Sequence, residues 1–324
     1  MSTPVLPDLP DVLAARRVLG GVARRTPVLT CEALDELAGC QLFFKAENLQ
    51  LTGSFKVRGA FNKIHSLSPP ELARGLITVS AGNAALGAAW AARAVGAALV
   101  VVMPENAVAE KLAAVAALGA RIEKEGIANA TQAFARLAEL QAAHGYTLVH
   151  PFDDPLVVAG AATAAWELLE EVPDLNVLAV PASGGGLLGG TLLAARALAP
   201  AARVYGVQPE GAAGIVRSLE AGVPTAPERI ETVADGLTAP RPGRLNFELI
   251  RLYATGVTTV SDPSILAAMG LIARHLKVLV EPAGAAALAA VLSREFPEES
   301  LRGRRVGVLL SGGNTGMERV REVI

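Results

Sequence analysis

The sequence predicts an α/β protein with two open, twisted and mostly parallel sheets flanked by helices. Two observations predict this class. Short apolar runs alternate with amphipathic helical stretches almost from end to end, which is the pattern of repeated βαβ units. About ten such apolar runs occur, which is many for one open sheet. We therefore expect two sheets in two domains.

A helix is expected after a turn at residues 52–54, with Ser54 as its N-cap. Apolar side chains then recur at helical spacing, at Val57, Ala60, Phe61 and Ile64, so one face should be buried. Lys56 falls in the first turn of this helix. The free backbone N–H groups there disfavour a cation, so we expect a lowered pKa for Lys56.

The following segments continue the alternation of strand and helix. The strands expected in the first half are "GLITVS" (75–80), "ALVVVMP" (98–104) and "RIEKEG" (121–126). The helices between them are "NAALGAAWAARAVG" (83–96) and "AEKLAAVAALG" (109–119). The later strands are "NVLAVP" (176–181), "RVYGVQP" (203–209), "GVTTVS" (256–261) and "RRVGVLLS" (304–311). No Ser- or Pro-rich linker separates two halves, which suggests that the chain crosses between domains more than once.

Composition excludes several classes of function. Apolar residues make up 52% and the formal net charge is −2, so neither nucleic acid nor an anionic membrane surface is an expected partner. Residues 175–195 carry no charge, but Pro181 and five glycines interrupt them, which favours a strand, a loop and a helix over a membrane span. The two cysteines and the absence of a signal-peptide pattern indicate a cytoplasmic protein. The four histidines are scattered, and we expect no metal site.

Three loops share one design, in which an apolar strand leads through small polar residues into a helix. They are centred on Ser80–Asn83, on Ser183–Gly186 and on Ser311–Asn314. The carboxyl ends of strands are where ligands bind in open α/β sheets, and helix starts favour anions. All three could be plain tight connections. However, three such loops together with a lysine at an unfavourable helix position are harder to explain as tight connections alone.

A glycine-rich phosphate cradle and an amine of lowered pKa point together to a phosphorylated aldehyde held by a lysine. Pyridoxal 5'-phosphate meets both requirements. The same loop has the spacing Gly184-x-Gly186-x-x-Gly189 of a dinucleotide fingerprint, so a nicotinamide-dependent dehydrogenase is the alternative. Gln208 ends the next strand, where such an enzyme would carry an acidic residue, which disfavours this alternative.

Several segments in a fixed order resemble the fold-type II pyridoxal-phosphate enzymes. They are "LTGSFKVRGAFNKI", "SAGNAALGAAWAARAVG", "HPFDDPLVVAGAATAAWEL", "PASGGGLLGG", "EPAGAAALAAV" and "LLSGGNTG". The resemblance covers nearly the whole chain and is greatest to threonine/serine dehydratases and serine racemases. It implies a homodimer with the cofactor between a large domain, residues 1–66 and 153–324, and a small domain, residues 67–152. The chain ends at Ile324, so we expect no C-terminal regulatory domain and no feedback inhibition through one.

The resemblance also assigns roles to individual residues. Lys56 would bind the cofactor covalently and then act as the base at the substrate Cα. Phe55 would pack near the ring, and Ser311 would face the pyridine nitrogen. Asn83 would hydrogen-bond the phenolic oxygen of the cofactor. The phosphate would be bound by Ser183, Gly184, Gly185, Gly186 and Leu187. The substrate carboxylate would be bound by Ser80, Ala81, Gly82 and Asn83. Asn83 could also be a plain helix N-cap. Glu281 could face the ring or cap a helix, and the sequence leaves both open.

The reaction implied is the elimination of water and ammonia from L-threonine or L-serine, with release of a 2-oxo acid. Ser311 is a neutral partner for the ring nitrogen, which makes the ring a weaker electron sink and favours rapid expulsion of a β-hydroxyl. Ala81 stands where serine racemases usually carry a serine, so racemisation should be poor. A racemase, a lyase for a bulkier β-hydroxy amino acid and a non-catalytic relative remain alternatives.

Three departures from the family pattern bear on these alternatives. Ala84-Ala85-Leu86 replaces the usual His-Ala-Gln and could leave space for an apolar substrate side chain. Gln208 and Gly214 stand where metal-binding relatives carry acids, which argues against a magnesium site. The segment "GAAT" (160–163) replaces the usual Gly-Gln-Gly-Thr.

Overall fold

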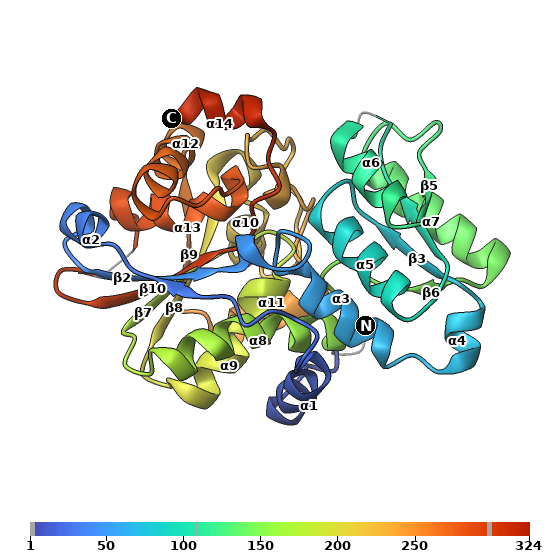
Figure 1. The fold of residues 1–324 in the computed structure, drawn as a ribbon, viewed down its shortest axis with the longest axis horizontal. Coiled ribbons are helices and arrows are strands. Elements are labelled where there is room, and N and C mark those ends of the chain that lie inside the picture. Colours follow the sequence, from blue (N-terminus) through green and yellow to red (C-terminus); the bar gives the residue numbers. More distant parts are fainter. Residues whose placement is uncertain (1–3, 106, 108, 297–299) are drawn as a thin grey trace.

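The computed structural model describes residues 4–105, 107, 109–296 and 300–324. It contains two sheets, each covered by helices, which form the two lobes visible in Figure 1. One sheet has six strands in the order β1-β2-β10-β7-β8-β9, and the other has four in the order β5-β4-β3-β6. The predicted α/β class with two mostly parallel sheets is therefore confirmed.

The strands of the six-stranded sheet come from both ends of the chain. They are β1 (Val28–Leu29), β2 (Gln41–Ala46), β7 (Val177–Pro181), β8 (Arg203–Pro209), β9 (Gly256–Val260) and β10 (Arg305–Leu310). Only the pair β1 and β2 is antiparallel; the other neighbours are parallel, with Val308 of β10 opposite Phe44 of β2 and Ala179 of β7. The membrane-length stretch at 175–195 is β7, a loop and the start of a helix, as expected, and no helix among the described residues is long and apolar enough to cross a membrane.

Helices cover both faces of this sheet, because its central strands are apolar on both sides. In β10, Val306, Val308 and Leu310 pack on one face and Leu309 packs on the other. The helices of the first face are α2 (Glu32–Ala38), α12 (Asp262–Leu271), α13 (Pro282–Ser293) and α14 (Met317–Val323). Those of the second face are α1 (Leu9–Leu19), α8 (Pro155–Glu171), α9 (Gly186–Leu198), α10 (Gly214–Ala221) and α11 (Arg244–Tyr253).

The four-stranded sheet is fully parallel and uses one continuous part of the chain. Its strands are β3 (Leu76–Val79), β4 (Leu99–Val102), β5 (Arg121–Glu123) and β6 (Thr147–Leu148). Leu76 of β3 packs under α5 (Asn83–Ala94), and Ile77 packs under α7 (Ala130–His144) on the opposite face. The other helices here are α4 (Pro69–Ala73) and α6 (Ala109–Ala117). All four strands lie within residues 67–152, which we keep as the proposed limits of the small domain.

The chain passes between the sheets twice. Helix α3 (Lys56–His65) leads toward the small sheet and packs against both α5 and α8, so it touches both lobes (Figure 1). The return runs through residues 149–154 into α8. Because β3, β7 and β10 all run parallel within their sheets, their carboxyl ends can meet at the junction of the two lobes.

Candidate active site

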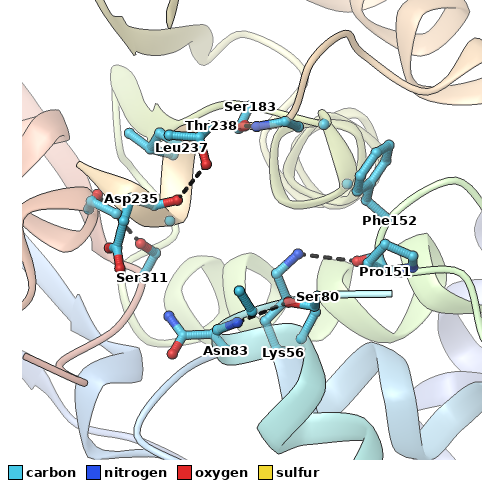
Figure 2. A pocket seen from close by; sticks show the side chains of 18 of the residues that line it. Lys56, Ser80, Asn83, Pro151, Phe152, Ser183, Asp235, Leu237, Thr238 and Ser311 are labelled. Atoms are coloured by element: carbon cyan, nitrogen blue, oxygen red, sulfur yellow. Dashed lines mark hydrogen bonds between the residues drawn. The ribbon is translucent and has the colours of Figure 1, made fainter. Parts of the chain in front are cut away.

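A cavity of about 310 Å³ lies between the two lobes, at the carboxyl ends of β3, β7 and β10 (Figure 2). Its walls hold every site residue that the sequence predicted: Phe55, Lys56, Ser80, Ala81, Gly82, Asn83, Ser183, Gly184, Gly185, Gly186, Leu187, Glu281 and Ser311. These residues come from five different segments of the chain. The topology thus brings together side chains that are far apart in the sequence.

Lys56 is the first residue of α3, and its amine points into the cavity (Figure 2). Nζ donates a hydrogen bond to the backbone carbonyl of Pro151 at 3.0 Å and lies 5.1 Å from the centre of the Phe55 ring. Burial lowers the pKa of Lys56 to about 8, and the nearby Glu281 carboxyl opposes this shift. The predicted lowering of the Lys56 pKa is confirmed, but its main cause is desolvation by burial and not the position at the helix start.

The predicted N-cap of α3 is wrong. The N-cap is Phe55, with helical backbone angles and no side-chain capping bond. Ser54 is fully buried, and its backbone forms an isolated β-bridge with Gly312, which holds it outside the helix. The chain therefore turns one residue later than the small polar residues suggest.

Asn83 is the first residue of α5 and is not its N-cap, which is Gly82. Its side chain is fixed from two directions: Asn314 Nδ2 donates to Asn83 Oδ1 at 2.7 Å, and Asn83 Nδ2 donates to Glu281 Oε1 at 2.5 Å. Because both partners are set, the amide orientation follows from the network. Asn83 thus presents a fixed polar group beside the cavity.

Glu281 precedes α13 in the N-cap position, but its side chain makes no capping bond and lines the cavity instead. It is 2% exposed, and Oε2 is buried with no hydrogen-bond partner within the described part of the chain. Burial is the main cause that raises the pKa of Glu281 to about 7, and the charge of Asp235 raises it further. The charges of Lys111 and Lys56 and the hydrogen bond from Asn83 act in the opposite direction. Of the two alternatives left open for this residue, the structure supports the one that faces the site.

The loop from Ser183 to Leu187 joins β7 to α9 and wraps around Phe152. Gly185 has φ +91°, and a Cβ on Gly184 would lie 2.4 Å from the Phe152 ring. Asn246 Nδ2 donates to the carbonyl of Gly184 at 2.9 Å, which anchors the loop from behind. The first backbone N–H groups of a helix have no acceptor within it, so the start of α9 suits a phosphate ester.

Ser311 follows β10 and is 5% exposed. Its hydroxyl lies 3.5 Å from the carbonyl of Ala283, longer than an ordinary O–H···O bond. It can therefore bond a further acceptor or donor in the cavity. A neutral hydroxyl at this place is consistent with the expected role toward a ring nitrogen.

The loop from Ser80 to Asn83 joins β3 to α5 and lines the cavity from the small lobe. Ser80 Oγ accepts a hydrogen bond from the backbone N–H of Gly82 at 3.1 Å. Ala84 also lines the cavity, but Ala85 and Leu86 are buried in the core of the small lobe. Only one residue of the Ala84-Ala85-Leu86 segment can therefore contact a substrate.

Some cavity residues were not predicted from the sequence. Lys111 of α6 forms an ion pair with Asp235, which belongs to the 3₁₀ turn η3 (Asp235–Leu237) of the large lobe. Lys111 Nζ lies 3.9 Å from the point that a Cβ on Gly82 would occupy, so it is close to the substrate loop. Pro151 and Phe152 come from the segment between β6 and α8. In the sequence, only the family-like segment "HPFDDPLVVAG" pointed to Pro151 and Phe152 as site residues.

The residues present fit pyridoxal 5'-phosphate. An amine of lowered pKa, an anion-binding helix start and two polar groups that can take further bonds, Ser311 Oγ and Glu281 Oε2, surround one cavity. Each group matches a different part of that molecule: the aldehyde, the phosphate ester and polar atoms of the ring. By contrast, Gln208 stands where a dinucleotide-binding enzyme would carry an acidic residue, and its amide bonds the backbone of Ile215 and Ala212 instead.

Comparison with known proteins places the chain in a family. Residues 20–312 match the model described as pyridoxal-phosphate dependent enzyme. The chain is 38% identical to the L-threonine ammonia-lyase of Thermotoga maritima over 98% of its own length and 78% of that protein. It is 39% identical to the L-threo-3-hydroxyaspartate ammonia-lyase of Saccharomyces cerevisiae, over 99% of this chain and 97% of the other.

A solved structure gives the same result for the fold. The maize serine racemase superposes with a TM-score of 0.93 at 35% identity, covering 98% of this chain and 97% of the racemase. The similar proteins thus include an ammonia-lyase for threonine, one for hydroxyaspartate and a racemase for serine.

Proposed function

The chain belongs to the fold-type II pyridoxal-phosphate enzymes, in the family of threonine dehydratases, serine racemases and hydroxyaspartate ammonia-lyases, and from this premise we propose that it eliminates the β-hydroxyl of L-threonine or L-serine. The products would be a 2-oxo acid and ammonia. The family binds pyridoxal 5'-phosphate, so the earlier nicotinamide alternative is set aside. The homodimer remains a prediction.

When bound, the cofactor stabilises negative charge at the substrate Cα. The residues around it divide the remaining work. Lys56 would hold the cofactor, and its free amine would be the base for the Cα proton, because a pKa of about 8 leaves part of this amine neutral near pH 7.5. The N–H groups at the start of α9 would hold the phosphate ester. The loop from Ser80 to Asn83 orients the substrate carboxylate at the start of α5.

The observation that carries the choice of elimination is Ala81. It lies in the cavity wall, within the substrate loop, and its methyl group has no proton to donate. A racemase needs an acid that returns a proton to the second face of Cα. Loss of the β-hydroxyl is then the outcome that these residues favour.

The test is a panel of L-threonine, L-serine and L-threo-3-hydroxyaspartate, assayed for 2-oxo acid release and for the chirality of the remaining amino acid. We expect 2-oxo acid without the D-enantiomer, and we expect Lys56→Ala to abolish turnover. Ala81→Ser is the matched variant, which should introduce measurable racemisation. A wild-type protein that racemises L-serine faster than it deaminates it would contradict the proposal. A protein with no turnover on any member of the panel or on β-phenylserine would indicate a non-catalytic relative.

A second candidate is a lyase for a β-hydroxy amino acid with an apolar β-substituent. The cavity wall contributed by the small lobe includes Ala84, Pro104, Ala133 and Phe134, and Phe152 adds a further apolar side chain from the segment between β6 and α8. The only cation of this wall, within the described residues, is Lys111, which is already paired with Asp235. A β-phenylserine substrate distinguishes this candidate: a kcat/KM above that for L-threonine would favour it.

A further inference from the structure

His150 lies next to the site, although it makes no contribution to the reaction described so far. Its Nδ1 accepts hydrogen bonds from the backbone N–H of Phe152 at 3.3 Å and of Asp153 at 2.8 Å. Pro151 sits inside the tight turn that these bonds close. Its carbonyl is the acceptor for Lys56 Nζ at 3.0 Å, as the dashed line in Figure 2 shows.

The turn depends on a side-chain acceptor. Pro151 has a fixed φ and no N–H, and the residue before a proline is restricted to extended conformations. The backbone at His150 therefore cannot form a helical turn. A side-chain atom that bonds the N–H groups two and three residues later is the usual substitute, as in the turns made by Asn and Asp. Here His150 Nδ1 supplies that atom.

The surroundings keep the imidazole in the form that this role needs. Because Nδ1 accepts, the neutral ring carries its proton on Nε2. Burial lowers the pKa of His150, and the charge of Lys56 lowers it further, while Asp153 and Asp154 oppose both. The ring is also held between Phe152, at 4.7 Å between centroids, and Phe134, at 6.0 Å. Both its orientation and its neutral state are thus favoured.

We infer that His150 is a positioning residue, whose Nδ1 shapes the turn that presents the Pro151 carbonyl to the Lys56 amine. The inference rests on the proposed role of Lys56 as the amine that captures the cofactor. A carbonyl bonds an ammonium more strongly than a neutral amine. The turn therefore both directs the Lys56 amine and supports its protonated form, opposing the effect of burial.

Two substitutions separate the acceptor from the ring. His150→Asn places Oδ1 at the covalent position of Nδ1 and keeps the acceptor, whereas His150→Leu places a methyl group there. The readout is the rate at which the full-length apoprotein captures added pyridoxal 5'-phosphate, followed by absorbance from pH 6 to 10. Thermal unfolding of each apoprotein is recorded in parallel. No amino-acid substrate is present, so the result does not depend on which substrate the enzyme uses.

We expect the wild type and His150→Asn to share a midpoint close to the Lys56 pKa of about 8. In His150→Leu the midpoint should fall by about one pH unit, because the ammonium loses its carbonyl acceptor. The plateau rate should fall roughly tenfold, because the amine is no longer directed.

A Leu variant with the wild-type profile overturns the inference. The inference is also overturned if His150→Asn captures the cofactor as poorly as a folded His150→Leu variant. In that case the imidazole ring, and not the hydrogen-bond acceptor, would be responsible for normal capture. If the Leu variant does not fold, the Asn variant decides alone: normal capture supports the inference and impaired capture overturns it. Normal capture in the wild type without turnover of L-threonine or L-serine would contradict only the proposed function.

Discussion

Asn83 and Glu281 form a hydrogen bond that joins the two lobes within the cavity wall, from the start of α5 to the residue before α13. Glu281 Oε1 takes this bond while Oε2 remains buried without a partner among the described residues. A Cβ on Gly312 would lie 2.4 Å from Oε1, so no larger residue fits beside the pair. A carboxyl group in this setting favours its neutral form, which links the protonation of the site to the stability of the protein.

The first prediction concerns this linkage. Glu281 has a pKa raised from 4.5 to about 7, so the folded protein binds a proton that the unfolded chain has released. Its contribution is fully present below pH 4.5 and is lost as the pH rises through 7. We expect the free energy of unfolding of the apoprotein to fall by up to about 3 kcal/mol across this window. Glu281→Gln keeps an acceptor for Asn83 and should remove this part of the slope.

The measurement is urea unfolding at several pH values in the wild type and the variant, which cancels the other titrating groups. Asp235→Asn is the intermediate control, because the charge of Asp235 raises the pKa of Glu281. It should lower the pH at which the loss is complete. Identical slopes in the wild type and in Glu281→Gln would show that Glu281 titrates normally in the folded protein.

The second prediction concerns the contact between α5 and the start of α3. An ideal Cβ on Gly87 would lie 2.9 Å from the carbonyl carbon of Lys56 and from the backbone nitrogen of Val57. Alanine usually stabilises a helix relative to glycine. In this place we expect Gly87→Ala to destabilise the protein by about 1–3 kcal/mol and to lower kcat about tenfold, because backbone and not a flexible side chain must move.

Gly20→Ala is the matched control, because its nearest atoms lie 3.4 Å from the added carbon. The two variants are compared by thermal unfolding and steady-state kinetics. Equal behaviour would mean that α3 can move without displacing Lys56.

The repeating parts of the fold and the local parts of the site could be predicted from the sequence. The apolar runs predicted β3, β4, β5 and β7 to β10, because burial on both faces of a parallel sheet leaves a local apolar pattern, but β1, β2 and β6 were not predicted. Lys56, Asn83 and the loop at 183–187 could be placed because each sits where a strand or turn leads into a helix. Ser54 was misplaced as an N-cap because a distant residue, Gly312, holds its backbone.

The contacts between distant segments could not be predicted. Lys56 and Pro151 are 95 positions apart, and Lys111 and Asp235 are 124 apart. No local pattern links either pair. His150 was treated as one scattered histidine among four, although the proline after it already restricted its backbone. The sequence suggested that the segment Ala84-Ala85-Leu86 could leave space for an apolar substrate side chain, but helical periodicity turns Ala85 and Leu86 into the core.

The third prediction concerns metal independence. Gln208 is the second-last residue of β8 and is 1% exposed. Its Oε1 accepts the N–H of Ile215 at 2.9 Å, and its Nε2 donates to the carbonyl of Ala212 at 3.1 Å. The amide thus ties the strand end to the start of α10 with hydrogen bonds alone. In the described parts of the chain, no group of three or more His, Cys, Asp or Glu could hold a metal ion. We expect neither activity nor melting temperature to change after treatment with EDTA.

Gln208→Glu extends this test. The second carboxylate oxygen would face the Ala212 carbonyl, so we expect a loss of about 1–3 kcal/mol in EDTA and a partial recovery in millimolar Mg²⁺. Wild-type protein that loses activity in EDTA and regains it with Mg²⁺ would contradict the prediction.

The fourth prediction concerns the buried charges beneath α3. Arg58 is fully buried and forms ion pairs at 2.7 Å with both Glu47 and Glu167. Lys45, also fully buried, bonds Glu167 at 2.7 Å. Burial alone would lower the pKa of Arg58, but the neighbouring carboxylates raise it. Burial alone would raise the pKa of Glu47, but the charge of Arg58 lowers it. Every charge of this group therefore depends on the others.

Arg58→Met should cost about 3–5 kcal/mol, because it leaves the buried Glu47 carboxylate without its main partner. The double variant Arg58→Met/Glu47→Gln should recover much of this loss, since no unpaired charge remains at Glu47. Urea unfolding of both variants and of Glu47→Gln completes the double-mutant cycle. If Arg58→Met and Glu47→Gln were simply additive, Arg58 would act through packing alone, and the proposed dependence among the charges would be wrong.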